Sequence, residues 1–294
     1  MPADPIDRPA VTTEVTAWFA AHARPLPWRE ADCTPWGVMV SEYMLQQTPV
    51  ARVLPVWAAW LDRWPTPAAL AADEPGEAVR AWGRLGYPRR AQRLHAAAMI
   101  IRDEHGGSVP VDLTTLRALP GVGDYTAAAI ASFAHGQRHV VLDTNVRRVL
   151  ARLEGGQEFA PASLTKAERE RAQAWLPDEP SAAAAWAAAS MELGALVCTA
   201  DNPACGRCPV RSACAWVAAG RPAWAGPPRV GQTYAGTDRQ CRGALLAVLR
   251  EAEDAVPRER LLAAWTSDPV QAERALASLL ADGLVRADGD GVRL

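Results

Sequence analysis

The segment from Cys198 to Cys214 restricts the fold of this chain most strongly. It carries four cysteines, Cys198, Cys205, Cys208 and Cys214, in the spacing C-x6-C-x2-C-x5-C. Four thiolates this close in sequence can surround one tetrahedral ion or one metal cluster. No secretory signal is predicted, so we expect a reducing compartment in which disulfides do not persist. The spacing suits both structural zinc and a 4Fe-4S cluster, and we predict a loop folded around one of the two.

Helical spacing of apolar residues dominates the chain before residue 220. It recurs over residues 12–22 and 34–133, between breakers such as Trp64-Pro65-Thr66-Pro67 and His105-Gly106-Gly107. Strand signals are nearly absent there, because the β-branched run 138–142 is short. We therefore predict a mainly α fold.

The last part of the chain has a different composition. Residues 221–239 are rich in Pro and Gly and are predicted to form a linker. Helices are then predicted at 242–253, 258–265 and 270–282, followed by a hairpin at 284–294. This order favours a small winged-helix-like module at 240–294, although it also suits a structural appendage.

Charge and hydropathy limit the possible partners. The formal net charge of −2 neither favours nor excludes nucleic acid, because the location of positive charge decides phosphate binding. No apolar run reaches the roughly 20 residues of a membrane span, so we expect a cytoplasmic protein with no membrane contact. Seven basic residues crowd one segment and predict either phosphate contacts or a solvated face: Arg80, Arg84, Arg89, Arg90, Arg93, His95 and Arg102.

The segment Leu119-Pro120-Gly121-Val122-Gly123 breaks one helix just before the next begins at Asp124 or Tyr125. Its two glycines allow a tight turn with N–H groups pointing outward at a helix N-terminus, which favours an anion. Such a hairpin can hold a DNA phosphate without reading sequence, or it is an ordinary turn between helices.

Two carboxylates are candidates for catalysis. Asp143 lies between an apolar segment and the start of a helix, where Asp usually acts as an N-cap but could also stabilise a positively charged sugar. Glu42 lies in a mostly apolar helix, where burial favours the protonated form that a general acid needs. Two carboxylates in different environments are sufficient for cleavage of a glycosidic bond, and we predict this reaction.

Taken in order, these segments resemble the MutY-type adenine DNA glycosylases, which are related to endonuclease III. The resemblance covers about residues 12–216. It implies a two-lobed helix-hairpin-helix glycosylase fold with an iron-sulfur cluster loop, in which 1–30 and 136–220 form the cluster lobe and 31–135 form a helical barrel lobe with the hairpin. The matching segments are Leu26-Pro27-Trp28-Arg29, Ser41-Glu42-Tyr43-Met44-Leu45-Gln46-Gln47-Thr48, Leu85-Gly86-Tyr87, the hairpin, Leu142-Asp143-Thr144-Asn145-Val146, Met191-Glu192-Leu193-Gly194-Ala195 and the four-cysteine loop.

This resemblance implies a monofunctional glycosylase of base excision repair, which hydrolyses the N-glycosidic bond of adenine mispaired with 8-oxoguanine or guanine and leaves an abasic site. Its partner would be double-stranded DNA with such a mispair, bound by a monomer associated with the bacterial nucleoid. Glu42 would protonate adenine N7, and Asp143 would stabilise the oxocarbenium ion or a covalent intermediate.

The resemblance also implies roles for further residues. The sugar and Asp143 would be supported by Tyr125 and Asn145. The pocket for the flipped base would be lined by Trp28, Arg29, Leu45 and Glu192, and the opposing guanine would be probed by Gln46, Gln47 and Thr48. Tyr87 would contact the DNA, a phosphate would be held by Gly121, Val122 and Gly123, and a 4Fe-4S cluster would be held by Cys198, Cys205, Cys208 and Cys214.

Two features depart from the family pattern. Many relatives have a second tyrosine that wedges into the DNA stack, whereas Pro88 follows Tyr87 here. Relatives commonly also have a C-terminal domain, resembling the Nudix fold, that senses 8-oxoguanine, and the roughly 55 residues after Gln240 are too short for it. The preference for 8-oxoguanine over guanine opposite adenine is therefore left open.

Two other functions stay open. An endonuclease III-type glycosylase with lyase activity needs a catalytic lysine, but this chain has Tyr125 at that position and its single lysine, Lys166, in a polar loop. A DNA-binding regulator, built from a metal module and a winged helix, leaves Glu42 and Asp143 without a role. Zinc in place of iron would favour the regulator.

Overall fold

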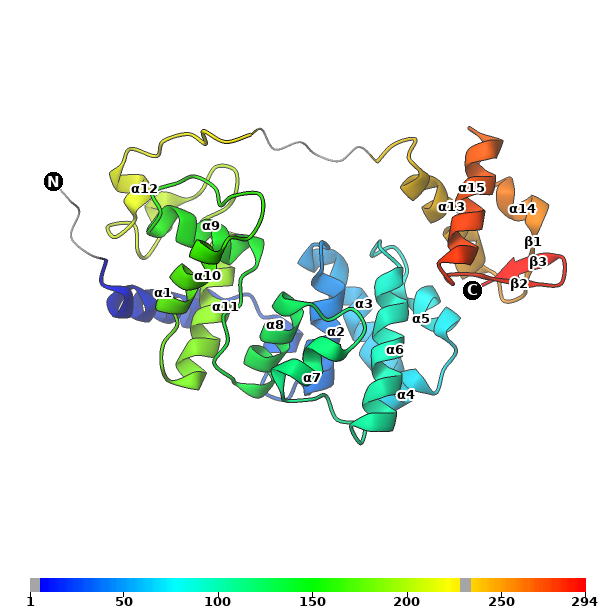
Figure 1. Cartoon of the computed structure of the whole chain (residues 1–294), viewed down its shortest axis with the longest axis horizontal. Helices are drawn as coiled ribbons and strands as arrows, with labels where there is room; N and C mark the ends of the chain where they lie inside the picture. The colour runs from blue at the N-terminus through cyan, green and yellow to red at the C-terminus, as the bar shows by residue number, and fades with distance from the viewer. Residues whose placement is uncertain (1–5, 228–233) are drawn as a thin grey trace. The chain divides into compact units, whose positions relative to one another are not determined.

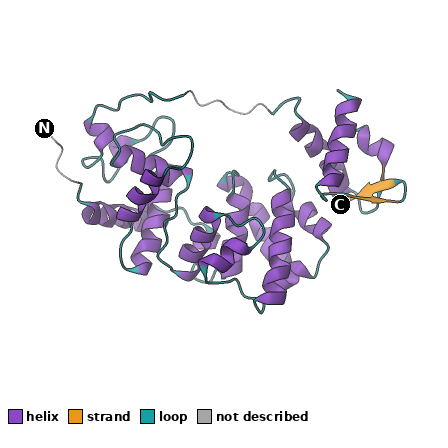
Figure 2. Cartoon of the chain, viewed as in Figure 1, coloured by secondary structure: helices purple, strands orange, loops and turns teal. Residues whose placement is uncertain are grey.

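The computed structural model describes residues 6–227 and 234–294; residues 1–5 of the predicted cluster lobe and 228–233 of the predicted linker lie outside it. Helices dominate the described residues, which confirms the mainly α fold (Figure 2). None of the described helices is long and apolar enough to cross a membrane.

The chain divides into two compact units. Unit 1 comprises Met1–Pro35, Val111–Arg117 and Val122–Pro228, and unit 2 comprises Trp36–Pro110, Ala118–Gly121 and Arg229–Leu294. The boundaries of the two lobes expected from the sequence stay predictions.

Unit 1 is built around the alanine-rich helix α11 (Figure 1). This helix packs against α1, α8 and α9, and its small side chains allow close approach of the neighbouring backbones. Trp186 of α11 stacks on Trp175 with ring centroids 5.5 Å apart, inside a core that includes Val15 and Leu150. The helices are α1 (Arg8–His22), η1 (Pro27–Arg29), α7 (Leu113–Ala118, whose last residue belongs to unit 2), α8 (Asp124–His135), α9 (Thr144–Leu153), α10 (Lys166–Ala174), α11 (Pro180–Leu196), η2 (Cys205–Arg207) and α12 (Ala215–Ala218).

The first part of unit 2 contains α2 (Pro35–Leu45, whose first residue belongs to unit 1), α3 (Val50–Arg63), α4 (Pro67–Ala71), α5 (Pro75–Trp82) and α6 (Arg89–Glu104). Every residue of α2 from Trp36 to Met44 is buried, as expected of a mostly apolar helix, and Ser41 and Glu42 are its buried polar residues. Trp60 packs edge-on against Trp64 and Trp82, and α6 packs against α4 and α5.

The C-terminal module contains α13 (Asp238–Glu251), β1 (Val256–Pro257), α14 (Arg258–Leu262), α15 (Pro269–Ala281), β2 (Arg286–Asp288) and β3 (Gly291–Arg293). Its antiparallel sheet has the order β1-β3-β2, so the predicted hairpin is confirmed. This element order agrees with the order expected for a winged-helix-like module, and the assignment to that class stays a prediction. Strand β1 was not predicted, because two residues are too short to show a periodicity.

The predicted linker differs from the structure at both ends. Helix α13 begins at Asp238, because the side chain of Thr237 accepts a hydrogen bond from the backbone N–H of Gln240 and caps the helix. At the other end, Trp224 packs edge-on against Phe159 and its backbone N–H donates to Glu158 at 2.7 Å. These ends of the segment are therefore part of the folded units.

The basic segment at 80–102 is largely used within unit 2. Arg90 and His95 are buried, which excludes both a phosphate contact and a solvated face for them. Arg89 forms an ion pair with Asp282, and Arg102 forms one with Asp103. The prediction of phosphate contacts or a solvated face is therefore wrong for Arg90 and His95.

Candidate active-site residues

Asp143 caps the N-terminus of α9 in unit 1. Its Oδ1 accepts a hydrogen bond from the backbone N–H of Val146 at 2.6 Å, so the N-cap interpretation is confirmed. Its Oδ2 accepts from the side-chain amide of Asn145 at 2.7 Å. Burial raises the pKa of the Asp143 carboxyl above its ordinary value, and the two hydrogen bonds partly oppose that rise.

A buried arginine connects Asn145 to the start of the cysteine loop. Arg148 donates to the side-chain oxygen of Asn145 at 2.7 Å, to the carbonyl of Gly194 at 2.7 Å and to the carbonyl of Cys198 at 2.7 Å. Gly194 permits this arrangement, because a Cβ there would lie 2.6 Å from the Cβ of Asn145. The sequence analysis missed Arg148; its place three residues after Asn145 on one helix was the available signal.

Glu192, predicted to line the base pocket, is fully buried on α11 and holds two arginines. Arg24 binds it through Nε and Nη2, both at 2.7 Å, and Arg29 binds through Nη2 at 3.0 Å. Burial acts to raise the pKa of Glu192, but the hydrogen bonds from the two arginines outweigh it and hold that pKa at about 2. The carboxylate is therefore ionised and fixes the position of Arg29. Arg24 was missed, because it lies 168 residues away in sequence.

The remaining aromatic candidates of unit 1 lie in η1 and at the start of α8. Trp28 is buried in η1, next to Arg29. Tyr125 is half-buried in the first turn of α8 and packs against the apolar cluster that includes Ala129 and Val141.

In unit 2, Glu42 is 5% exposed in the middle of α2. Leu45, predicted to line the base pocket, is half-buried as the last residue of α2. The predicted opposing-base segment follows it: Gln46 is half-buried, Gln47 is exposed and Thr48 is buried. Gln47 adopts the left-handed conformation with φ of 56°, which is strained for a residue with a side chain.

Arg90, which the sequence analysis did not assign to the site, holds this segment next to the loop that carries Tyr87. Its Nη1 donates to the carbonyls of Tyr43, Met44 and Gln46 at 2.9, 2.9 and 2.5 Å. Its Nη2 donates to Thr48 Oγ1 at 2.9 Å and to the carbonyl of Gly86 at 3.0 Å. Tyr87, like Gln47, is left-handed, with φ of 48°. Strained residues persist where the surroundings fix them, and Arg90 provides that restraint for both loops.

The two glycines of the predicted phosphate hairpin have different backbone conformations. Gly121 has φ of 85°, and a Cβ there would lie 2.9 Å from the ring of Tyr43. Gly123 has φ of −95° and a Cβ there would meet nothing within 4 Å, so the expectation that both glycines form the turn is wrong for Gly123. Val122 is buried, and Gly123 leaves the N-terminus of α8 without a capping side chain.

The four predicted metal ligands, Cys198, Cys205, Cys208 and Cys214, line one cavity together with Arg152, Val197, Arg211, Trp216 and Val217. Arg152 is 1% exposed, donates to Cys198 Sγ at 3.4 Å and lies 4.6 Å above the Trp216 ring. Burial raises the pKa of the Cys208 thiol to about 11. Within residues 6–227 and 234–294, no group of three or more His, Cys, Asp or Glu side chains is close enough to hold a single metal ion.

The candidates thus form two groups. Asp143 and Asn145 are joined through Arg148 to the cysteine loop in unit 1, whereas the segment after α2 and Tyr87 are joined by Arg90 in unit 2. Glu42 and Asp143 belong to different units, and their pairing in one site stays a prediction.

Known proteins resemble this chain over most of its length. Residues 40–175 match the family model described as HhH-GPD superfamily base excision DNA repair protein. The adenine DNA glycosylase of Mycobacterium tuberculosis is 52% identical over 279 residues, covering 95% of this chain and 91% of that protein. The adenine DNA glycosylase of Mycolicibacterium smegmatis is 52% identical over 278 residues, covering 95% and 93%. A thermostable thymine-DNA glycosylase structure superposes with a TM-score of 0.64 at 24% identity, covering 72% of this chain and 97% of that chain, which supports the fold alone.

Proposed function

The chain belongs to the adenine DNA glycosylase family, and from this membership we propose that it hydrolyses the N-glycosidic bond of adenine mispaired with 8-oxoguanine or guanine, leaving an abasic site. The observation that carries the proposal is the carboxylate of Asp143, which is half-buried and held by two hydrogen-bond donors. Its substrate is double-stranded DNA with the mispair, which it binds as a monomer in the bacterial nucleoid.

Asp143 stabilises the positive charge that develops on the sugar as the bond to adenine breaks. Its hydrogen bonds from Asn145 and Val146 fix the carboxylate in one orientation, so little reorganisation is needed when the charge appears. Partial burial strengthens the attraction, because less water screens it. Glu42 is buried and donates a proton to N7 of the leaving adenine.

Cleavage of the DNA backbone is not part of the proposed reaction. A Schiff-base lyase needs an amine that becomes neutral in a desolvated site. Lys166, the only lysine of the chain, is the first residue of α10 and does not lie in a loop as expected. Its side chain is 90% exposed and pairs with Glu170 at 3.5 Å. The product is therefore an intact strand with an abasic site.

The four cysteines fit a 4Fe-4S cluster, since they line one cavity as an all-sulfur set of donors. The buried guanidinium of Arg152, which donates to Cys198, offsets the negative charge of thiolate ligands. When bound, the cluster cross-links the loop from Cys198 to Cys214. The backbone N–H groups of Gly121, Val122 and Gly123 hold a DNA phosphate at the start of α8.

The test uses the protein in excess over duplexes with adenine opposite 8-oxoguanine, guanine or thymine, followed by hot alkali to cleave abasic sites. We expect excision opposite 8-oxoguanine and guanine but not thymine, with strand breaks only after alkali. Asp143→Asn abolishes excision, whereas Asp178→Asn, an exposed control in the same unit, keeps it. Excision from none of the duplexes, or strand breaks without alkali, overturns the proposal.

The iron content and visible absorption of the purified protein test the cluster separately. Zinc in place of iron contradicts the cluster.

A further inference from the structure

The C-terminal module is anchored to α5 and α6 within unit 2. Arg80 of α5 donates through Nη1 to the carbonyls of Leu249, Arg250 and Ala252, at 3.1, 2.5 and 2.8 Å. It thereby binds the C-terminal end of α13, where unpaired carbonyls favour a cation. Further contacts join Arg89 to Asp282, Gln92 to Gly283, Arg250 to Val79 and Arg286 to Glu74.

Away from these anchoring contacts, Arg239 of α13 lies against two exposed tyrosine rings. Its guanidinium carbon is 6.0 Å from the ring centroid of Tyr87 and 5.2 Å from that of Tyr234. Its Nη1 also donates to the hydroxyl of Tyr87 at 3.1 Å. Tyr87 is 44% and Tyr234 is 51% exposed, so both rings are accessible to a ligand. We call these three side chains the aromatic platform.

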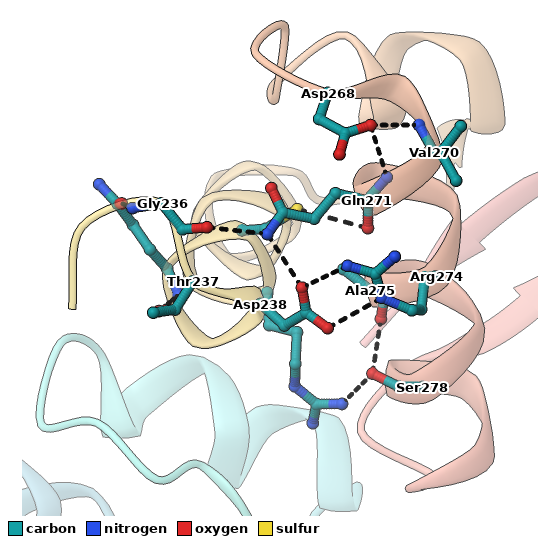
Figure 3. A network of polar contacts seen from close by, with 12 residues as sticks. Gly236, Thr237, Asp238, Asp268, Val270, Gln271, Arg274, Ala275 and Ser278 are labelled. Atoms are coloured by element: carbon teal, nitrogen blue, oxygen red, sulfur yellow. Dashed lines mark hydrogen bonds and ion pairs between the residues drawn. The ribbon is translucent and has the colours of Figure 1, made fainter. Parts of the chain in front are cut away.

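Both sides of the aromatic platform are held in place. On one side, Arg90 bonds the carbonyl of Gly86 and lies 5.7 Å from the ring of the left-handed Tyr87. On the other side, Asp238 accepts hydrogen bonds from Gln271 and Arg274, as Figure 3 shows, and this fixes the first turn of α13 that carries Arg239. A prearranged set of rings loses little conformational freedom when it binds a ligand.

Positive charge accompanies the aromatic platform. Arg52 donates to the carbonyl of Arg84. Burial lowers the pKa of Arg90, which holds the Tyr87 loop, and the positive charge of Arg52 lowers it further. Burial lowers the pKa of Arg250 in the module, and the positive charge of Arg84 lowers it further. In the part of the chain that the structure describes, neither Arg52 nor Arg84 forms an ion pair. At the rings themselves, the guanidinium carbons of Arg90 and Arg239 lie 5.7 Å and 6.0 Å from the ring centroid of Tyr87, and this positive charge suits a polyanion.

We propose that Tyr87, Arg239 and Tyr234 form a stacking platform for an unpaired base of the DNA substrate, so that the C-terminal module takes part in binding the mispair. Exposed aromatic rings next to arginine bind unstacked bases, since every base presents a π face. An exposed cation–π contact contributes little to folding stability, so binding explains the arrangement better than packing does. The identity of the ligand as DNA rests on the proposed function.

The test measures the affinity of the full chain, carrying Asp143→Asn to prevent turnover, for duplexes with adenine opposite 8-oxoguanine or opposite thymine. We expect Tyr234→Ala and Arg239→Gln to weaken binding of the mispaired duplex by roughly tenfold, with a smaller effect on the paired duplex. Tyr234→Phe keeps the ring and retains the affinity. A 2-aminopurine beside the mispair is quenched by stacking, and its fluorescence recovers in Tyr234→Ala.

Arg258→Gln is the matched control, because Arg258 is an exposed arginine of the same module that pairs with Glu273. Equal affinity of Tyr234→Ala and the parent for the mispaired duplex, with both proteins folded by circular dichroism, overturns the inference. An equal loss in Arg258→Gln also overturns it, since the effect is then one of net charge. Adenine release is measured separately with Asp143 intact: if no adenine is released but mispair binding still depends on Tyr234, the proposed reaction fails and the aromatic platform stands.

Discussion

The side-chain amide of Asn145 donates a 2.7 Å hydrogen bond to the carboxylate of Asp143. Arg148 sets the orientation of the Asn145 amide, because a guanidinium can only donate and therefore binds the amide oxygen. The NH₂ group is left to face Asp143. A buried cation thus orients a neutral amide, and the amide supports the carboxylate on which the proposed reaction depends.

Replacing Asn145 by Ala will raise the pKa of Asp143 further, because a donor that stabilises the ionised form is lost. The pH below which adenine release fails should move upward, and the rate at neutral pH should fall roughly 10- to 100-fold, as for a hydrogen bond to a charged group. Single-turnover adenine release measured across pH tests this. Thr144→Ala, at an exposed neighbour, should keep the parent profile. An unchanged acid limb in Asn145→Ala would count against a role for the amide.

Asp143→Asn should be more stable than the parent at neutral pH, by about 0.5–2 kcal/mol, even though it is inactive. Burial raises the pKa of Asp143 in the folded state, so folding of the ionised form is penalised above the ordinary pKa of Asp. Asn also caps helices well, so the N-cap is retained. The gain in the free energy of unfolding should vanish as pH falls below that ordinary pKa. Urea unfolding at several pH values measures it, and equal stabilities at pH 7 would refute the prediction.

Glu192→Gln should destabilise the protein by about 3–5 kcal/mol, since it leaves Arg24 and Arg29 without their buried carboxylate. The pKa of Glu192 is held at about 2, below its ordinary value of 4.5, so this carboxylate stabilises the fold above pH 4.5 and the stabilisation is lost as pH falls towards 2. The parent should therefore lose stability over that range more steeply than the variant does. Thermal unfolding from pH 2 to 7 makes the comparison, and parallel curves would contradict it.

Arg90→Met should cost at least about 2 kcal/mol of stability and also lower mispair recognition, because the loops carrying Gln47 and Tyr87 lose their common donor. The excision rate should fall for both 8-oxoguanine and guanine duplexes under conditions where the variant is folded. Arg102→Met, on the same helix, loses an exposed ion pair and one hydrogen bond to the carbonyl of Ala71, so it should cost less, under about 1.5 kcal/mol. An Arg90 variant with full activity would show that neither loop needs this restraint.

Gly121→Ala and Gly123→Ala form a matched pair in the hairpin. Gly121→Ala should cost about 1–3 kcal/mol, because its φ is 85° and its Cβ would meet Tyr43. Gly123→Ala should cost under about 1 kcal/mol, since its backbone is extended and the added methyl group meets open space. Urea unfolding distinguishes the two, and similar losses would mean that the turn geometry is not what requires Gly121.

Several parts of the structure follow from local sequence signals. Asp143 before a helical segment predicts an N-cap, and it is one, because capping involves only backbone groups within three residues. The Asp288-Gly289-Asp290-Gly291 turn predicts the C-terminal hairpin for the same reason. The cysteine spacing predicts four thiols around one centre, and the four line a common cavity. Each of these signals lies within about 20 residues of chain.

Other features depend on which segments meet in the folded chain. Arg90 was expected to contact phosphate or solvent, and Arg148 was given no role. Both side chains are buried and donate to backbone carbonyls. No periodicity encodes this, because the carbonyls come from segments 40 to 50 residues away and attract the cation only once they are desolvated.

The sequence by itself determined the helical class, the capped start of α9, the turn at Gly121 and the clustering of the four thiols, since these rest on backbone geometry and on short spacings. Only the tertiary structure decided that Glu192 binds Arg24 and Arg29, that Arg90 joins two strained loops and that Arg239 reaches Tyr87 from a module more than 150 residues later. The physical reason is that burial sets the strength of charge interactions. Burial depends on how the elements pack and not on which residues are neighbours in the sequence.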